Sequence, residues 1–294
     1  MADYTDYTDE TLALPDGDVG YLRREGAGAG TVLFAHANGL NAGAYAPLLG
    51  ALGGPETVIA PDLRGHGLTT LPAEPETLTR WDQYADDLVR IVRALAPEGP
   101  LTLAGHSMGA VSSLLAAAQG LDVVRVVMIE PVILPRAVRV LARSPLQAAT
   151  RRRGIAGRAA RRRDAWPDAD AVRAQYEETG FFKGWDEAAL AGYLARGLRE
   201  TEDGVTLACA PAWEAASFAA QGHRFWRPLA AVAARVPVHV LAARGRSTVP
   251  SADGQRLARA GALTAGMEGT HMLPTERPRH VAAWVSMSVA GGRV

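Results

Sequence analysis

A serine flanked by glycines is the most reactive arrangement in this sequence. The segment GHSMG at residues 105–109 places Ser107 between an apolar run at 101–104 and an Ala- and Leu-rich stretch at 108–119. A tight turn between a strand and a helix projects such a hydroxyl outward, and flanking glycines let the two elements pass closely. The helix N-terminus also favours negative charge that develops beside it. We therefore predict that Ser107 is the nucleophile of an acyl-transfer reaction.

A serine nucleophile requires a base, and His271 occupies a suitable position. It lies in the segment GTHML, after the last strand-like run and before the last helical stretch. A base in a loop at the carboxyl end of the final strand, later in the chain than the serine, suits this architecture. The other histidines are expected in loops, in a strand, in an insertion or on a helix surface: His36, His66, His106, His223, His239 and His280.

The base must itself be oriented by a carboxylate, and the sequence offers two candidates. The loop at residues 242–250, which follows a strand at 236–241, contains no Asp or Glu. Glu130 follows the strand that ends at Ile129, so its carboxylate should face the same crevice as Ser107. The competing interpretation is that Glu130 caps a helix or pairs with an arginine. Asp253 is the alternative acid, but we expect it to cap the helix that follows it.

Acyl transfer also needs hydrogen-bond donors for the oxyanion. The backbone N–H of Met108, directly after the nucleophile, is the first candidate. The second is expected from the loop HANG at residues 36–39, where we predict Asn38, with Gly39 or Leu40 as alternatives. We expect His36 and the loop DLRGHG at 62–67 to be structural, with Arg64 tying backbone carbonyls.

Alternating strand and helix patterns must position these residues. Short apolar runs predict buried strands at four places before residue 135: 31–35, 57–60, 101–104 and 123–129. Helical patterns at 81–95 and 108–119 separate them, which indicates a parallel sheet covered by helices on both faces. Strand patterns vanish after Pro135, resume at 236–241 and 263–267, and a last helix is expected at 277–289.

The segment between these two halves is predicted to be a mostly helical insertion. It contains an Arg-rich run at 151–163 and aromatic clusters that include Phe181, Phe182 and Phe218. The aromatic side chains either line a substrate pocket or pack the insertion onto the core. The Arg-rich run is expected to be a solvated helix face, with attraction of an anionic substrate or a partner as the alternative.

Composition excludes several classes of function. Lys plus Arg equals Asp plus Glu at 31 each, so nothing global attracts nucleic acid or anionic membranes. The single cysteine, Cys209, excludes an internal disulfide framework and a cysteine-type zinc site. The N-terminus lacks a secretory pattern and no apolar run approaches membrane-spanning length, so a cytoplasmic protein is expected. We expect no metal and no cofactor.

Together these motifs resemble the α/β-hydrolase family. The marks are the segments at 36–39, 62–67, 105–109 and 269–271, in that order. The resemblance implies an α/β fold with an eight-stranded, mostly parallel sheet and a helical lid inserted after strand six. Residues 1–135 and 236–294 would form the core, and residues 136–235 the lid.

Two positions depart from the usual family pattern. The oxyanion loop reads His36-Ala37 where the family usually has His-Gly, and the acid usually found after strand seven is missing. Some family members, including certain haloalkane dehalogenases, carry the acid after strand six, and Glu130 matches that alternative. A serine nucleophile argues against dehalogenase and epoxide hydrolase chemistry, because both use an Asp nucleophile.

These observations predict a serine esterase that forms an acyl-enzyme on Ser107, with His271 as base and Glu130 as acid. The expected substrate is a small ester, or a lactone, that is partly apolar or aromatic. Two alternatives are kept. The same triad could act on another bond, as in a C–C hydrolase, a thioesterase or a perhydrolase, or the fold could serve as a non-catalytic ligand-binding protein.

Overall fold

The protein is built around one large, mostly parallel sheet, as the sequence predicts. The computed structural model describes residues 7–135, 138, 140, 142 and 153–291. The eight strands lie in the order β1-β2-β4-β3-β5-β6-β10-β11; β2 is antiparallel to both its neighbours, and the other pairs are parallel. Their bounds are β1 (Thr8–Leu14), β2 (Gly17–Arg24), β3 (Thr31–Ala35), β4 (Thr57–Pro61), β5 (Leu101–His106), β6 (Arg125–Ile129), β10 (Val238–Ala243) and β11 (Ala262–Met267).

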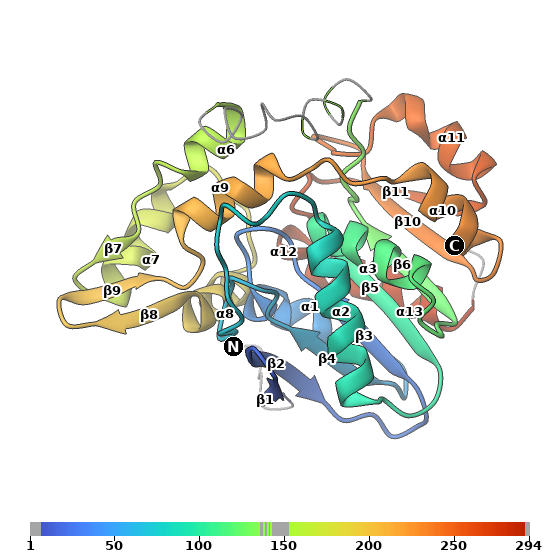
Figure 1. Cartoon of the computed structure of the whole chain (residues 1–294), viewed down its shortest axis with the longest axis horizontal. Helices are drawn as coiled ribbons and strands as arrows, with labels where there is room; N and C mark the ends of the chain where they lie inside the picture. The colour runs from blue at the N-terminus through green and yellow to red at the C-terminus, as the bar shows by residue number, and fades with distance from the viewer. Residues whose placement is uncertain (1–6, 136–137, 139, 141, 143–152, 292–294) are drawn as a thin grey trace.

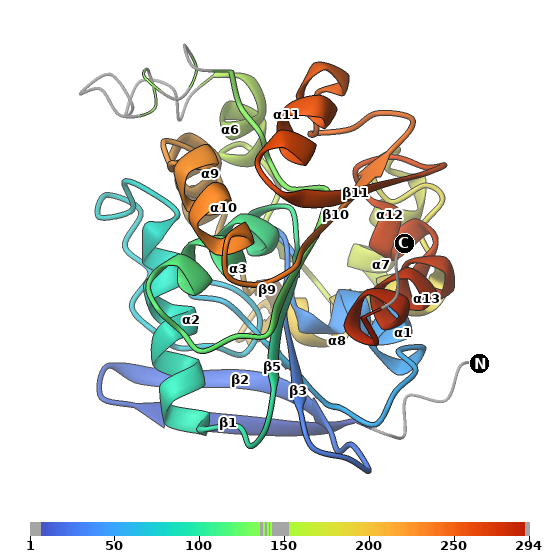
Figure 2. The ribbon, with the colours of Figure 1, turned by 90° about the vertical axis from the view of Figure 1, so that its right-hand side faces the viewer.

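Helices cover both faces of this sheet (Figures 1 and 2). One face carries α2 (Asp82–Leu95), α3 (Met108–Ala118) and α10 (Trp226–Ala233), while the other carries α1 (Ala46–Gly50), α12 (Leu273–Glu276) and α13 (Pro278–Val289). Strand β6 shows why the inner strands are continuous apolar runs. Val126 and Met128 point into the core on the first face, and Val127 and Ile129 into the core on the second. A strand covered on both faces therefore reads as a nearly continuous apolar run.

A separate layer lies between β6 and β10 in the sequence. We call its described residues 153–219 the insert. It contains helices α6 (Gly154–Ala159), α7 (Ala169–Glu178), α8 (Glu187–Gly197) and α9 (Pro211–Ala219), and strands β7 (Ala165–Trp166), β8 (Leu198–Thr201) and β9 (Gly204–Leu207). The insert extends to one side of the sheet, on the left in Figure 1.

Two expectations about the insertion need correction. Its three strands form an antiparallel sheet in the order β7-β9-β8, although the sequence shows no strand pattern there. The reason is that β8 is largely solvent-exposed and therefore lacks an apolar run. Helix α10 falls within the predicted insertion at 136–235, but it packs against α3 of the core.

Buried polar contacts fasten the insert to the core loop at residues 62–69. Arg196 of α8 donates from Nη2 to Asp62 Oδ2 at 2.8 Å, and the Asp62 carboxylate is fully buried. Arg199 donates to the carbonyl oxygen of Gly67 at 3.0 Å. Trp213 of α9 donates to the carbonyl oxygen of Arg64 at 3.0 Å. The 62–67 loop is therefore a brace between the two layers.

Arg64 itself acts differently from the expectation that it ties backbone carbonyls. Its main partner is the Asp87 carboxylate, which it contacts from Nε at 2.8 Å and from Nη2 at 2.6 Å. One carbonyl, that of Pro72, accepts from Nη1 at 2.7 Å. Arg64 therefore joins the loop to helix α2.

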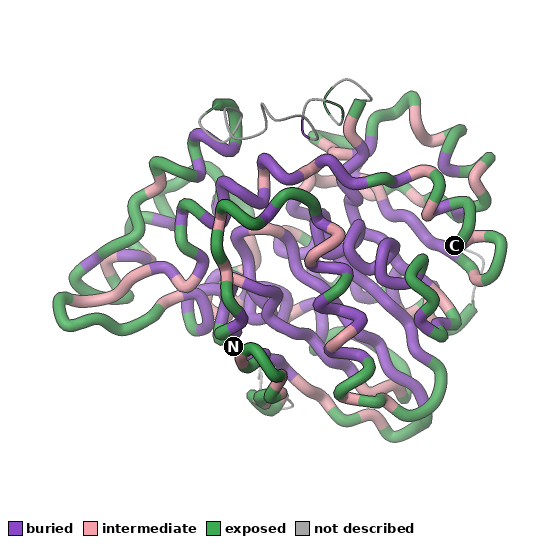
Figure 3. The backbone as a smooth tube through the Cα atoms, viewed as in Figure 1, coloured by how far each residue is buried: buried purple, intermediate pink, exposed green. Residues whose placement is uncertain are grey.

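Burial follows these layers. Figure 3 shows the tube buried along the inner strands of the sheet and mixed along the insert, where exposed segments alternate with buried ones. Within the described ranges, no helix combines the length and apolar character needed to cross a membrane.

Candidate active site

Ser107 lies on a sharp turn between β5 and α3. Its backbone has φ 55° and ψ −113°, a left-handed conformation that is unusual for a residue with a Cβ. The flanking glycines are required by close contacts. A Cβ on Gly109 would lie 2.1 Å from the carbonyl oxygen of Ala35, and one on Gly105 would lie 2.5 Å from the carbonyl carbon of Gly109. The turn thus packs β5, α3 and β3 together and presents the hydroxyl of Ser107.

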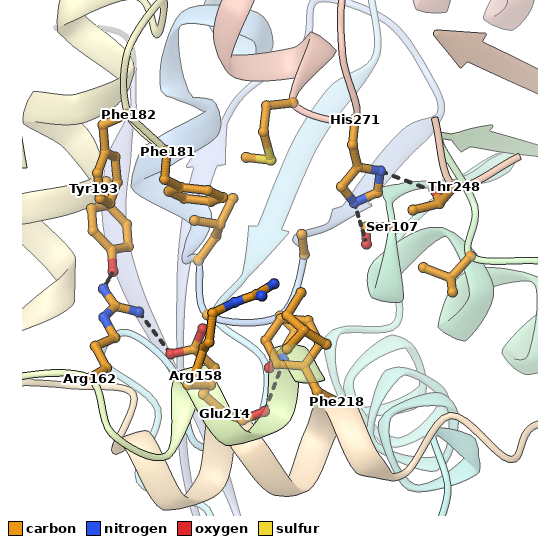
Figure 4. A pocket seen from close by; sticks show the side chains of 18 of the residues that line it. Ser107, Arg158, Arg162, Phe181, Phe182, Tyr193, Glu214, Phe218, Thr248 and His271 are labelled. Atoms are coloured by element: carbon orange, nitrogen blue, oxygen red, sulfur yellow. Dashed lines mark hydrogen bonds and ion pairs between the residues drawn. The ribbon is translucent and has the colours of Figure 1, made fainter. Parts of the chain in front are cut away.

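Three predicted residues form one hydrogen-bonded chain at the carboxyl edge of the sheet. Ser107 Oγ lies 3.0 Å from His271 Nε2, and His271 Nδ1 lies 3.0 Å from Glu130 Oε2. They come from the turn after β5, the loop after β11 and the end of β6, so widely separated segments meet at this edge. Figure 4 shows the imidazole of His271 directed at the hydroxyl of Ser107. The geometry permits proton transfer from Ser107 to His271.

The Glu130 carboxylate is fully buried and surrounded by donors. It accepts hydrogen bonds from the Ala243 N–H at 2.6 Å, the Ser247 hydroxyl at 2.6 Å and the Thr248 N–H at 2.8 Å. Burial raises the pKa of Glu130, but the hydrogen bonds from His271, Ser247 and the two backbone N–H groups outweigh it and hold the pKa below its ordinary value. A carboxylate therefore faces His271. The described partners of Glu130 include no arginine and no helix N-terminus.

Asp253, the alternative acid, lies outside the hydrogen-bonded chain of Ser107, His271 and Glu130. Asp253 ends a short 3-10 turn, η2 (Ser251–Asp253), and stands at the N-cap position of α11 (Gly254–Arg259). Its carboxylate makes no hydrogen bond to the described part of that helix, so the expected capping role is wrong. Among the described contacts of His271, the carboxylate is that of Glu130.

Sequence reasoning missed Thr248 and Ser247, which lie in the loop after β10. Thr248 Oγ1 is 3.1 Å from His271 Nδ1 and 3.0 Å from the Glu130 carbonyl oxygen. Ser247 donates to Glu130, as described above. In the sequence, this loop is distinguished by its lack of a carboxylate. The signal available in the sequence was a pair of hydroxyl residues where an acid is usually found.

His106, the neighbour of Ser107, links His271 to the 36–40 loop. Burial, with a contribution from His271, lowers the pKa of His106 well below its ordinary value, so the ring is neutral. Its Nε2 lies 2.7 Å from the carbonyl oxygen of His271, which can only accept, so Nε2 carries the proton. Its Nδ1 therefore accepts from the Tyr45 hydroxyl at 2.7 Å, and that hydroxyl accepts from the Ala37 N–H at 3.0 Å.

The hydrogen bonds of the 36–40 loop distinguish the candidate oxyanion donors. The Gly39 N–H donates to His66 Nε2 at 3.0 Å, and the Leu40 N–H donates to the Ala37 carbonyl oxygen at 3.2 Å. Both alternatives to Asn38 are therefore engaged. Within the described residues the Asn38 N–H has no acceptor, and Met108 is the first residue of α3, where an N–H has no acceptor within the helix.

His36 is placed by two hydrogen bonds beneath this loop. Its Nε2 accepts from the Leu63 N–H at 2.8 Å, and its Nδ1 lies 2.7 Å from the Ala37 carbonyl oxygen. Burial and the nearby His66 lower the pKa of His36 well below its ordinary value. A neutral, fully buried ring in this position has no access to substrate, and it connects β3 to the 62–67 loop.

A cavity of about 680 Å³ opens beside Ser107 and His271. Asn38, Met272 and Thr248 line it on the core side. The insert and the segment after it provide most of the opposite wall, which includes the aromatic residues Tyr176, Phe181, Phe182, Tyr193 and Phe218. Other aromatic residues of the predicted clusters, such as Trp213 and Phe225, are buried away from the cavity lining. One subset of the aromatic residues therefore lines the cavity, and another subset packs into the core.

The Arg-rich run also divides into two groups. Arg162 is directed inward: it donates to Glu214 Oε2 at 2.8 Å, to the Tyr176 hydroxyl at 2.7 Å and to the Tyr193 hydroxyl at 2.9 Å (Figure 4). Burial lowers the pKa of Arg162, but the nearby Tyr193 and Glu214 outweigh burial and hold the pKa above its ordinary value. The guanidinium is therefore charged. The expectation of a solvated face is wrong for Arg162. Arg161 is exposed, as expected for a solvated face. Arg151 and Arg152 lie outside the described residues.

No metal-binding cluster of three or more His, Cys, Asp or Glu side chains occurs in the described part of the chain. Cys209 is buried, and burial raises the pKa of its thiol well above the ordinary value. The polar residues that line the cavity include Ser107, Thr248 and His271 on the core side and Arg158, Arg162, Arg163 and Glu214 on the insert side.

Known proteins resemble this chain in sequence and in structure. A 2-(acetamidomethylene)succinate hydrolase from Mesorhizobium japonicum is 41% identical over 104 residues, which cover 35% of this chain and 36% of that protein. The chain is thus matched to about a third of that relative's length. A crystal structure of E-2-(acetamidomethylene)succinate hydrolase superposes with a TM-score of 0.74 at 22% identity and covers 97% of this chain and 99% of that one.

A second solved structure, the thioesterase domain from the curacin biosynthetic pathway, superposes with a TM-score of 0.76 at 16% identity and covers 95% of this chain and 98% of that one. At such identities these structures show a common fold and no more. The sequence profile described as "Alpha/beta hydrolase family" matches residues 32–284, which run from β3 into α13 and include every residue of the Ser107–His271–Glu130 chain. With the sheet order and the turn at Ser107 as described, the chain belongs to the alpha/beta hydrolase family.

Proposed function

We propose that this protein is a serine hydrolase that cleaves a carboxylic ester or a lactone through an acyl-enzyme on Ser107. The observation that carries the proposal is the position of His271. Its Nε2 lies 3.0 Å from Ser107 Oγ, and its Nδ1 lies 3.0 Å from the buried Glu130 carboxylate. An imidazole held between a hydroxyl and a carboxylate is oriented to accept the hydroxyl proton.

The proposed cycle uses only groups already described. Ser107 Oγ attacks the carbonyl carbon while His271 Nε2 accepts its proton, and the N–H groups of Met108 and Asn38 stabilise the oxyanion. His271 then protonates the leaving oxygen as the C–O bond breaks. A water molecule attacks the acyl-enzyme with His271 again as base, which releases the acid and restores Ser107. Glu130 stabilises the imidazolium in both halves of the cycle.

The cavity supports a small, partly apolar substrate. Its volume of about 680 Å³ is in the range of small-molecule sites, and Phe181, Phe182 and Phe218 line it. Because much of the wall comes from the insert, we propose that the insert acts as a lid that shapes the acyl-binding site. Phe181 is 51% exposed, so it belongs to the cavity rim and not to the packed core.

A second candidate keeps Ser107 and His271 and changes the bond that is cleaved. The relative that is 41% identical over 104 residues is named for hydrolysis of 2-(acetamidomethylene)succinate. That name describes a molecule with an acetamide and two carboxylates. The observation that favours this candidate is the presence of several arginines in the cavity lining, since guanidinium groups pair with carboxylates.

A labelling and turnover experiment tests the proposal. The protein is treated with a fluorophosphonate probe and assayed on nitrophenyl esters of increasing acyl length, on lactones and on 2-(acetamidomethylene)succinate. We expect covalent labelling at Ser107 by peptide mass spectrometry, and we expect ester turnover to fall by roughly 10⁴-fold or more in Ser107→Ala. Turnover of the succinate derivative without ester turnover would replace the first candidate by the second. Absence of labelling and of all turnover would leave a ligand-binding protein.

A further inference from the structure

Three arginines line the cavity beside a single carboxylate. Arg158, Arg162 and Arg163 come from α6 and the turn that follows it, and Glu214 comes from α9. Among the described lining residues, Glu214 is the one Asp or Glu. The cavity wall on the insert side therefore carries more positive than negative charge, although the chain as a whole has a formal net charge of zero.

Two of these arginines already have partners. Arg162 donates to Glu214 and to two tyrosine hydroxyls, as described above. Arg163 donates from Nε to the Ala165 carbonyl oxygen at 2.7 Å, and its guanidinium carbon lies 5.1 Å from the Trp166 ring centroid. Both side chains therefore make contacts within the insert.

Arg158 differs from both. Its guanidinium has no hydrogen bond or ion pair with any residue in the described ranges, and Figure 4 shows its side chain extending into the cavity. The helix that carries it is packed, because Ala156 and Ala159 on either side are buried. Arg158 therefore presents an unpaired cation from a fixed backbone position, in the same cavity as Ser107.

We propose that Arg158 binds a carboxylate of the substrate, at a point remote from the carbonyl that Ser107 attacks. A guanidinium presents parallel N–H donors that match a carboxylate, and such charge-assisted pairs are stronger than neutral hydrogen bonds. The inference rests on the proposed function insofar as it treats this cavity as the substrate site. It narrows the substrate class to an acyl compound with an anionic group, held between apolar aromatic walls.

The nearby Glu214 does not compete for Arg158. Its Oε2 accepts from Arg162 at 2.8 Å, and within the described residues Glu214 forms an ion pair with Arg162 and not with Arg158. A substrate carboxylate would thus supply the counter-ion that the protein does not. Since Arg158 is exposed to solvent, the pair should weaken as ionic strength rises.

A matched pair of esters tests this inference. Mono(4-nitrophenyl) adipate carries a free carboxylate, and its methyl ester is neutral and similar in size. We expect the wild-type kcat/KM to favour the anionic ester, and Arg158→Gln to reduce that preference by about 10- to 100-fold, mainly through KM. Arg161→Gln is the control: Arg161 is an exposed neighbour in the same run that does not line the cavity, so the preference should be unchanged.

A binding measurement separates this inference from the proposed function. Ser107→Ala is titrated by calorimetry with monomethyl adipate and with dimethyl adipate, with and without Arg158→Gln. Binding of the monoacid that depends on Arg158, together with no ester turnover by the wild type, would support the carboxylate site and reject the ester-cleaving function. Ester turnover with an anionic preference equal in wild type and Arg158→Gln would reject the carboxylate site and keep the chemistry of Ser107.

Discussion

The two sides of the cavity are held by different kinds of contact. On the core side, backbone groups fix the site: the Ser107 N–H donates to the Ile129 carbonyl oxygen at 3.0 Å, and the N–H groups of Ala243 and Thr248 donate to Glu130. On the insert side, the polar group that faces the cavity joins side chains to side chains, namely Arg162, Glu214, Tyr176 and Tyr193.

This difference separates chemistry from recognition. Backbone donors are kept in every substitution except one to proline, and they hold the reacting groups in one geometry. Side-chain contacts in the insert can be exchanged one residue at a time, so the shape and charge of the cavity can change while the reacting atoms stay in place. Substitutions of the three residues of the Ser107–His271–Glu130 chain should therefore affect kcat, and those on the insert side should affect stability and KM.

The largest effect is expected from Glu130→Gln on the core side. An amide cannot stabilise the imidazolium of His271 and favours a different tautomer, so kcat should fall by about 1,000- to 10,000-fold while the fold is kept. Steady-state kinetics on a nitrophenyl ester measure it. Asp253→Asn is the matched control and should leave kcat within a factor of two. If Asp253→Asn has the larger effect, the role proposed for Glu130 is wrong.

A smaller effect, and one of a different kind, is expected from Arg162→Met in the insert. The substitution leaves the mostly buried Glu214 carboxylate without its cation, which should lower the free energy of unfolding by about 2–3 kcal/mol. Urea unfolding measures this loss, with the exposed Arg161→Met as control. A kcat for a short acetate ester close to that of the wild type would agree with a role of the insert in stability and recognition and not in the chemical step. A loss of kcat with no loss of stability would contradict it.

The smallest effect is expected from Ser247→Ala, which removes one donor from Glu130 and so raises the pKa of that carboxyl. A carboxyl whose pKa is depressed by folding contributes stability above its ordinary pKa, and the contribution is lost as the pH falls through the folded value. At pH 7 the free energy of unfolding of the variant should thus be about 1 kcal/mol lower than that of the wild type. We call this difference the deficit of the variant.

The pH dependence separates this effect from lost packing. The deficit of Ser247→Ala should shrink as the pH is lowered below the ordinary carboxyl value of 4.5, because Glu130 then becomes protonated in both proteins. Urea unfolding at a series of pH values follows it, with the exposed Ser251→Ala as control. A deficit that stays constant with pH would show that Ser247 contributes only packing.

The core side could be predicted from the sequence because its signals are local. Strands such as β3 and β5 are apolar runs, since helices cover both faces of the sheet at that point. Strands β1 and β8 could not be predicted, because they are partly or largely exposed and so lack an apolar run. Ser107, Glu130 and His271 each follow a strand of the parallel sheet, so their meeting at one edge could be predicted from the sequence. Their catalytic roles stay predictions.

The insert side could not be predicted because its contacts join distant positions. Arg162 and Glu214 are 52 residues apart, and nothing in the Arg-rich run distinguishes Arg162, which points inward, from Arg161, which does not. The position of each arginine depends on the direction in which α6 ends and on the packing of α9. Those depend on tertiary contacts, which a periodic pattern does not encode.

The left-handed backbone of Ser107 has a consequence for the evolution and engineering of this protein. A residue with a Cβ at φ 55° is less favourable there than glycine, so the native turn stores free energy that a glycine would release. Selection for thermal stability and selection for turnover therefore act in opposite directions at this position. A variant library screened only for heat resistance would enrich molecules that fold well and have lost the nucleophile, and stability alone is a misleading surrogate for activity in this fold.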